Sequence, residues 1–163
     1  MRTRRQLPAQ PRAGRVFGLL LVGVLLAVPG CVDRPEPTMP TWPAGVEQPP
    51  EYSFGDAVAG RSQRAWGPVF DALAQRFGRE RLEVGDYTLT AETGPDALRR
   101  ELDAELVGQR GWRTMAPQTV PSDAWAFGYE RPDGRHIVAL IGLDARPGDT
   151  RVPLTVVTTF PQR

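Results

Sequence analysis

The 163-residue sequence contains no lysine, one cysteine and one histidine. All 20 basic residues are therefore arginines, which excludes a lysine nucleophile or a Schiff-base lysine. Because Cys31 stands alone, an internal disulfide and a cysteine-rich zinc site are excluded. Because His136 stands alone, a multi-histidine metal centre is excluded as well. We expect neither a metal nor a cofactor.

The net charge of +1 does not describe the folded part of the chain. Five arginines precede the first acidic residue, Asp33, whereas 15 arginines face 19 acidic residues from Cys31 onward. That mildly acidic balance gives no support for phosphate binding, and no glycine-rich phosphate loop is present. We therefore expect no nucleic-acid partner.

The positive charge gathers in residues 1–15, which carry no acidic residue. They are followed by a 14-residue apolar run, VFGLLLVGVLLAVP, at positions 16–29. A helix needs about 18–20 apolar residues to cross the hydrocarbon layer, so this run has the length of a signal-peptide core instead. It closes on the tetrapeptide Val28-Pro29-Gly30-Cys31.

That tetrapeptide resembles the lipobox of bacterial lipoproteins, in which an aliphatic residue, a small residue and Gly or Ala precede a cysteine. Pro29 departs from the small residue usual at its position. In this family the cysteine sulfur receives a diacylglyceryl group, a signal peptidase cuts just before it, and the new amino terminus is often acylated. The resemblance implies cleavage between Gly30 and Cys31, acyl chains such as palmitate on Cys31, and a location on the extracytoplasmic face of the cell membrane or outer membrane.

Two alternatives are an uncleaved signal anchor and ordinary cleavage near residues 27–30. The first needs a longer apolar run, and the second needs an A-x-A site that is not there. Stable attachment by lipid takes at least two acyl chains, which a diacylated Cys31 would supply without a spanning helix.

A change of composition divides the rest of the chain into a tether at residues 31–50 and one domain at 51–163. Residues 32–50 contain six prolines, which favour extended polyproline conformations. Such a tether would hold the domain up to about 60 Å from the bilayer. Met39 and Trp42 are its large apolar residues. They would either contact a partner or the lipid surface, or simply form part of an unstructured spacer.

The apolar periodicity of the domain predicts two helices and several strands. Helices are expected at about 65–77 and 93–110, the first ending at Gly78 and the second starting with Thr93 as its cap and ending at Gly111. Strands are expected at 82–91, 124–130, 135–143 and 152–160, with a bulge or bend at Gly85-Asp86 in the first. The predicted fold is α+β, an antiparallel sheet of about four to five strands with two helices packed on one face.

Few residues suggest catalysis. His136 lies near a turn, and neither Ser53, Ser62 nor Ser122 stands in a nucleophile elbow. A structural or solvent-facing histidine explains it better.

Pairs of carboxylates have equally simple explanations. Glu101 and Glu105 are one helical turn apart but fit a solvated helix face. Asp144 and Asp149 flank a turn without the oxygen pattern of a calcium loop.

Two groups of residues are candidates for binding. Arg99, Arg100, Arg110 and Arg113 would bind an anion, a lipid headgroup or an acidic partner if they gather at one end of the second helix, although cations near a helix C-terminus also complement its dipole. Trp125, Phe127 and Tyr129 alternate along one strand, as a ligand platform or as a core face.

Residues 93–160, a helix ending in Gly-Trp followed by strands, resemble many small uncharacterised bacterial envelope lipoproteins. The resemblance implies an accessory extracytoplasmic role and carries over no catalytic residue. We therefore expect a membrane-anchored lipoprotein whose non-catalytic domain binds another envelope protein. The alternatives are an envelope hydrolase using paired carboxylates and a sensor of small ligands.

Overall fold

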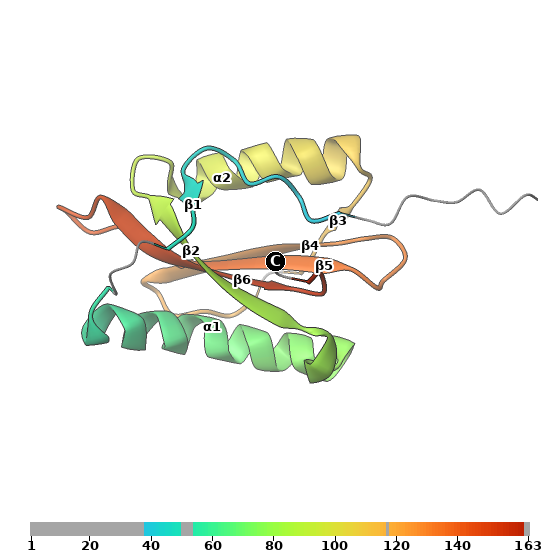
Figure 1. The fold of residues 1–163 in the computed structure, drawn as a ribbon, viewed down its shortest axis with the longest axis horizontal. Helices are drawn as coiled ribbons and strands as arrows, with labels where there is room; N and C mark the ends of the chain where they lie inside the picture. The colour runs from blue at the N-terminus through green and yellow to red at the C-terminus, as the bar shows by residue number, and fades with distance from the viewer. Residues whose placement is uncertain (1–37, 50–53, 117, 162–163) are drawn as a thin grey trace, which may run out of the picture. The chain divides into compact units, whose positions relative to one another are not determined.

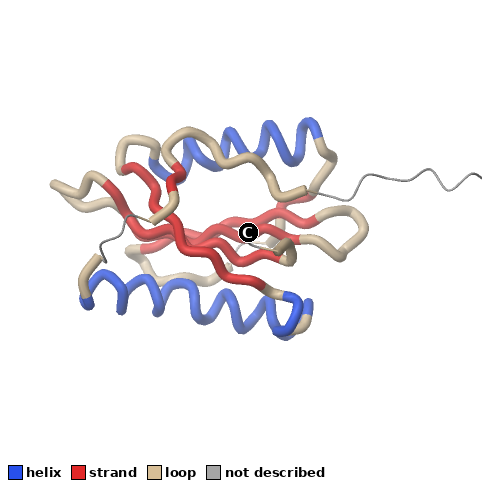
Figure 2. The backbone as a smooth tube through the Cα atoms, viewed as in Figure 1, coloured by secondary structure: helices blue, strands red, loops and turns tan. Residues whose placement is uncertain are grey.

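The computed structural model describes residues 38–49, 54–116 and 118–161. Within these ranges the chain forms one six-stranded antiparallel sheet in the order β1-β2-β6-β5-β4-β3, with a long helix above it and another below (Figures 1 and 2). The predicted α+β class is confirmed, and the sheet has two more edge strands than the sequence pattern defined because each of these is only two residues long.

The elements follow one another in the expected order of helices and longer strands. The strands are β1 (Val46–Glu47), β2 (Glu83–Thr90), β3 (Arg113–Thr114), β4 (Ala124–Glu130), β5 (Ile137–Leu143) and β6 (Arg151–Thr158). The helices are α1 (Asp56–Phe77), the short 3-10 turn η1 (Arg79–Arg81), α2 (Gly94–Leu102) and its π-helical continuation η2 (Asp103–Gln109).

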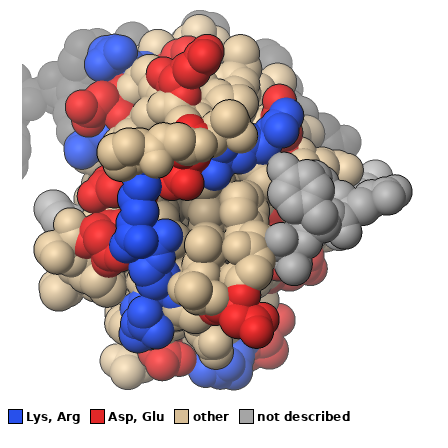
Figure 3. All heavy atoms as spheres, turned by 90° about the vertical axis from the view of Figure 1, so that its left-hand side faces the viewer, with Lys and Arg blue, Asp and Glu red and all other residues tan. Residues whose placement is uncertain are grey.

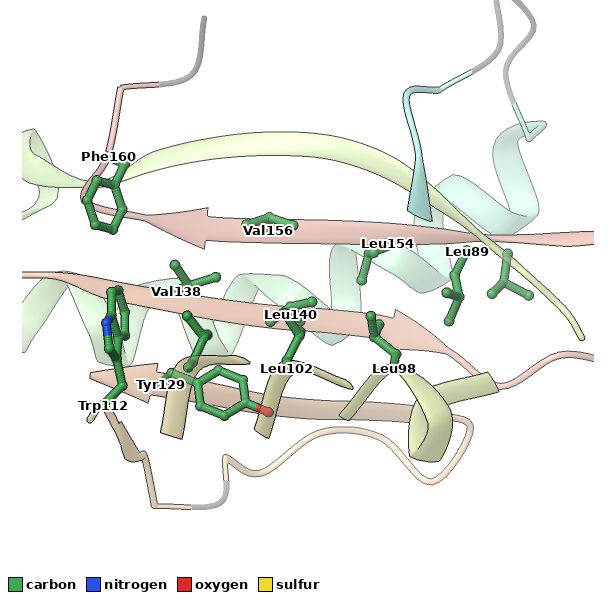
Figure 4. Packing of buried hydrophobic residues seen from close by; sticks show 12 residues of the cluster. Leu89, Leu98, Leu102, Trp112, Tyr129, Val138, Leu140, Leu154, Val156 and Phe160 are labelled. Atoms are coloured by element: carbon green, nitrogen blue, oxygen red, sulfur yellow. The ribbon is translucent and has the colours of Figure 1, made fainter. Parts of the chain in front are cut away.

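The two helices lie on opposite faces of the sheet, so the prediction that both pack on one face is wrong. Leu98 and Leu102 of α2 pack with Leu140 and Leu154 on one face (Figure 4). The other face belongs to α1, whose buried residues pack with a second set from the same strands. This second cluster includes Val69, Leu73, Ile137, Ile141 and Val157.

The sequence of β5 shows why two layers of helix are needed. All seven of its residues, IVALIGL, are buried. A strand with one solvated face alternates apolar and polar residues, whereas a continuous apolar run is typical of a strand covered on both faces. Its odd-numbered residues contact the α1 cluster, and Val138 and Leu140 contact the α2 cluster.

The same arrangement removes the predicted bulge in β2. Its pairing with β6 is continuous from Glu83 opposite Thr158 to Thr90 opposite Arg151. Leu82 packs in the α1 cluster, and Leu89 packs in the α2 cluster. Apolar residues therefore change from even-numbered positions before Gly85-Asp86 to odd-numbered positions after it because a regular strand buries a different face at each end.

Helix α1 starts at Asp56, nine residues before the predicted start. Pro68 consequently lies inside the helix and not in its first turn. The early half has a weak apolar pattern, but Val58 packs on the α1 cluster and Arg61 forms an ion pair of 3.2 Å with Asp123 beside β4. These tertiary contacts outweigh the local signal. The predicted stop at Gly78 is confirmed by its φ of 87°.

The second helix ends as predicted but begins without the expected cap. Gly111 has a φ of 66°, and the amide of the buried Trp112 donates to the carbonyl of Leu106 across 2.9 Å. Thr93 makes no side-chain capping bond, because its hydroxyl lies 2.8 Å from the hydroxyl of Thr90.

The folded domain begins before the predicted boundary at residue 51. Pro40 is buried, and Met39, Trp42 and Val46 pack against the α2 cluster. The Trp42 ring meets Tyr87 edge-on with a centroid distance of 5.3 Å. Residues 38–47 therefore belong to the domain, and the expected tether of 31–50 is shorter by that stretch.

The residues predicted as signal peptide and lipid attachment, Cys31 included, lie outside the described ranges.

Candidate functional site

The four arginines that the sequence grouped do not meet in space. Arg99 and Arg100 lie within α2, whereas Arg110 follows η2 and Arg113 lies on β3. At a rise of about 1.5 Å per residue, about 15 Å of helix separates Arg100 from Arg110. The expected single cluster at the end of the helix is therefore absent, and each arginine has its own surroundings.

Arg99 belongs to an aromatic surface on the α2 face of β4. Its guanidinium carbon lies 5.9 Å from the centre of the Phe127 ring, and its Nε lies 3.9 Å from Asp103 Oδ2. Phe127 in turn stacks on Trp125 at a centroid distance of 5.3 Å and an angle of 15°. We call Arg99, Trp125 and Phe127 the aromatic ledge. Neither ring is fully buried.

Tyr129, the third member of the predicted ladder, is a core residue. Its ring is buried, and its hydroxyl donates to Asp103 Oδ1 at 2.9 Å, with the carbonyl of Arg99 at 3.3 Å. Burial and then the hydrogen bond to Asp103 raise the pKa of Tyr129 far above the ordinary tyrosine value. The phenol thus stays protonated and ties β4 to the helix beneath the ledge.

Trp125 brings an unpaired donor to the ledge. Its Nε1–H is buried and has no hydrogen-bond partner among the described residues. The indole covers Gly142 of β5, whose missing side chain leaves room for it. A buried donor without an acceptor carries a cost in stability, and because this Nε1–H is covered it is not part of the exposed surface of the ledge.

Arg110 lies where the N-terminal segment joins the domain. Its Nη1 donates to the carbonyl of Thr38 at 3.3 Å, and its Nη2 lies 2.6 Å from Glu105 Oε1. Next along the chain, Met39 Sδ accepts from Thr158 Oγ1 at 3.9 Å, at the last residue of β6. The described chain therefore starts at the end of the sheet where β2 and β5 begin, and we call this the entry end.

His136 is also at the entry end, and it stacks on Phe160 at a centroid distance of 5.0 Å. Its Nδ1 lies 3.5 Å from Asp133 Oδ2 in its own turn. A backbone hydrogen bond from Arg135, and further the charges of Arg131 and His136, lower the pKa of Asp133.

The serines weighed as partners of His136 are elsewhere. Ser62 lies in the first half of α1, and Ser122 precedes β4 at the opposite end of the sheet. Ser53 lies outside the described ranges. Along β4 alone, seven residues of strand, about 23 Å, separate the two ends.

The carboxylate pairs behave as ordinary surface groups. Glu105 is occupied by Arg110, and Glu101 is exposed on α2. Asp149 Oδ2 accepts from the amide of Arg146 at 2.8 Å, as expected for a turn residue. Among the described residues, no group of three or more His, Cys, Asp or Glu side chains is arranged to hold a metal ion.

Charge is distributed unevenly between the two ends of the domain. The entry end carries seven arginines and six acidic residues, namely Arg76, Arg79, Arg81, Arg110, Arg113, Arg131, Arg135, Asp71, Glu80, Glu83, Glu105, Glu130 and Asp133. The far end carries three arginines and seven acidic residues, namely Arg61, Arg146, Arg151, Glu47, Asp56, Glu92, Asp96, Asp123, Asp144 and Asp149. Figure 3 looks at the far end, where acidic residues and arginines both lie on the surface.

The sequence did not predict that the proline-rich segment packs onto the domain, or that Arg81 and Arg135 meet at the entry end. The signals were Met39, Trp42 and Val46, apolar residues spaced along a proline-rich stretch, which predict an extended segment lying on an apolar surface. Arg81 and Arg135 gave no signal, because only the sheet register brings them together.

Comparisons with protein-family models, curated proteins and solved structures found no match to this chain. Within the described ranges, neither long helix is both long enough and apolar enough to cross a bilayer.

Proposed function

We propose that the protein is a bacterial lipoprotein with residues 1–30 as signal peptide and Cys31 as the lipid-bearing residue. The observation that carries the proposal is the tetrapeptide Val28-Pro29-Gly30-Cys31 at the end of a 14-residue apolar run, with Cys31 as the single cysteine. The folded domain follows this stretch, and its first described residue, Thr38, accepts a hydrogen bond from Arg110. Lipid on Cys31 would hold that domain at the extracytoplasmic surface of the cell membrane or outer membrane.

The domain itself is proposed as a non-catalytic module that binds another envelope protein through the aromatic ledge. Tryptophan, tyrosine and arginine contribute most of the binding energy at protein interfaces. The ledge offers Trp125 stacked on Phe127 with Arg99 against the Phe127 ring, and both rings are partly exposed. His136, by contrast, is engaged with Phe160 and its own turn.

The anchor is tested by changing the one cysteine. Cys31→Ser should abolish the lipid mass on the mature amino terminus and release the protein from the membrane fraction. Pro35→Ala, which alters the adjoining segment and keeps the thiol, should behave as the wild type. A Cys31→Ser protein still membrane-bound at the mature size, or a wild type whose first residue carries no acyl group, would contradict the anchor.

The binding role is tested with a photo-crosslinking amino acid at position 127, compared with one at Val107, an exposed residue of η2. The ledge position should give one defined protein adduct in the living bacterium, and position 107 should give none. Arg99→Glu should reduce the adduct at 127, whereas Arg100→Glu, its exposed neighbour, should not. Equal adducts from both positions, or none from position 127, would show that the ledge is not the binding surface.

A further inference from the structure

Three of the five exposed arginines that form no ion pair with a described residue lie at the entry end. Arg81, Arg113 and Arg135 are exposed, and none of them forms an ion pair with a described residue. Arg81 Nη2 donates to the carbonyl of Arg135 at 3.0 Å, and Arg113 lies opposite Glu130 in the sheet register, beside the same turn. We call these three arginines the basic end.

The opposite end carries the complementary excess. Asp56, Glu92, Asp96 and Asp144 are exposed there and form no ion pair with a described residue. The domain is therefore polarised along its length, positive where the chain enters and negative at the far side.

Chain length limits which end can approach the lipid. Seven residue steps join Cys31 to Thr38, and they span at most about 25 Å when fully extended. Helix α1 alone, with 22 residues, runs about 33 Å between the two ends of the domain. If the acidic end faced the bilayer, Thr38 would lie about 33 Å above it, beyond the reach of the chain. A domain attached through Cys31 must therefore stand on its entry end or lie on its side.

We propose that the basic end contacts the bilayer and that Arg81, Arg113 and Arg135 bind the phosphates of anionic lipid headgroups. This inference rests on the proposed lipid anchor at Cys31. Guanidinium groups pair with phosphate through several donors at once, and an anionic surface attracts each nearby arginine by about fivefold in affinity. The same field repels the acidic end. Charge and chain length thus select the same orientation and leave the aromatic ledge on the side of the domain, open to a partner.

The test uses the full, acylated protein in vesicles, because acylated Cys31 has no free thiol and an introduced cysteine is then the one labelling site. A fluorophore is attached to Gln109→Cys at the entry end or to Glu92→Cys at the far end, both exposed positions. The vesicles contain a quencher on their headgroups and either phosphatidylcholine alone or about one third phosphatidylglycerol. Quenching should be stronger at position 109, and the excess should be largest in anionic vesicles and decrease in high salt.

The variant Arg81→Gln/Arg113→Gln/Arg135→Gln should lose most of the added quenching that anionic lipid produces. Arg64→Gln/Arg100→Gln removes two exposed arginines that also lack carboxylate partners and should keep it. Vesicle flotation and the mass of the amino terminus are measured on the same samples. Protein that floats with lipid mass on Cys31 but is quenched equally at both positions, or is unaffected by the triple substitution, overturns the orientation alone. Protein that does not float, or carries no lipid mass, overturns the anchor and this inference with it.

Discussion

The hydroxyl of Tyr129 is the one buried polar link between β4 and the α2 helix that the described contacts record. Tyr129→Phe removes its bond to Asp103, a carboxylate that water reaches in part. We expect the free energy of unfolding to fall by about 1 kcal/mol near neutral pH. Urea titration followed by circular dichroism measures this change.

The raised pKa of Tyr129 also predicts the alkaline behaviour of the domain. An unfolded tyrosine ionises near pH 10, whereas the pKa of Tyr129 in the folded chain lies well above that value. Above about pH 10 the unfolded state therefore releases a proton that the folded state keeps, and stability decreases as the pH rises. Tyr129→Phe removes this part of the decrease, so the two proteins should approach each other in stability at high pH. A constant difference from pH 7 to about pH 11 would contradict this linkage.

Gly142 is required by the indole above it. A side chain added at this position would collide with the ring of Trp125. The φ of Gly142 is one that other residues also adopt, so the requirement for glycine is steric and not conformational. We expect Gly142→Ala to destabilise the domain by about 1–3 kcal/mol and to displace the ledge. Gly108→Ala, in η2, would place its Cβ at an ordinary contact distance of 3.8 Å from the carbonyl oxygen of Asp103 and should be neutral or stabilising by comparison. Thermal unfolding and crosslinking from position 127 measure the two effects, and a Gly142→Ala protein as stable as Gly108→Ala would contradict the steric argument.

At the scale of the elements, the second half of α1, the α2 helix and the long strands were predictable because their apolar residues recur at helical spacing, alternate, or form one short continuous run. The β4–β5 turn, the β5 run and the leucine stripe of α2 all lie where the sequence indicated. The two helices were placed on one face because antiparallel sheets often have a solvated side. The uninterrupted apolar run of β5 and the change in β2 from even-numbered to odd-numbered apolar positions indicate the opposite, a sheet that is covered on both faces. The strands β1 and β3 have no period to detect, since two residues cannot show one.

The two faces of the sheet should behave as separate cores. Val69 lies in the α1 cluster and Leu102 in the α2 cluster, with the sheet between them. Val69→Ala should cost about 1–2 kcal/mol and Leu102→Ala about 2–5 kcal/mol. Because the sites share no direct contact, the double variant should equal the sum within about 0.5 kcal/mol. Urea unfolding measures all three, and Leu98→Ala combined with Leu102→Ala serves as the coupled comparison within one cluster. A large deviation for the pair on opposite faces would mean that the two clusters act as one.

At the scale of the whole molecule, the least predictable feature is that a proline-rich stretch forms part of the core. Proline excludes helix and weakens strand pairing, but an extended segment can still lie on an apolar face through the side chains between its prolines. The candidate binding groups were likewise hidden, since Arg99 reaches Phe127 across elements and Arg81 reaches Arg135 across 54 residues of chain. Contacts of that range depend on the sheet register, which no single segment encodes.

The packing of the N-terminal stretch predicts a stability effect where a free tether predicts none. Trp42 is half-buried against Tyr87 and the α2 cluster, whereas Thr41 beside it is exposed. We expect Trp42→Ala to lower the free energy of unfolding by about 1–3 kcal/mol, since a half-buried aromatic loses less than a fully buried one. Thr41→Ala should stay within about 0.5 kcal/mol of the wild type. Equal stability of both variants in urea would mean that residues 38–47 do not contribute to the core.

The orientation at the bilayer combines a limit set by chain length with an attraction set by charge, and a longer spacer separates the two. Twelve Gly/Ser residues inserted between Pro35 and Glu36 raise the fully extended reach from Cys31 to Thr38 to about 65 Å, more than the length of the domain. On uncharged vesicles either end can then reach the surface, so headgroup quenching at positions 109 and 92 should become equal. On anionic vesicles the basic end should still be drawn to the phosphates, and position 109 should remain the more strongly quenched. If the preference disappears on both kinds of vesicle, chain length alone orients the domain and the three arginines do not bind lipid. If it persists on uncharged vesicles, a contact other than phosphate binding holds the entry end to the membrane.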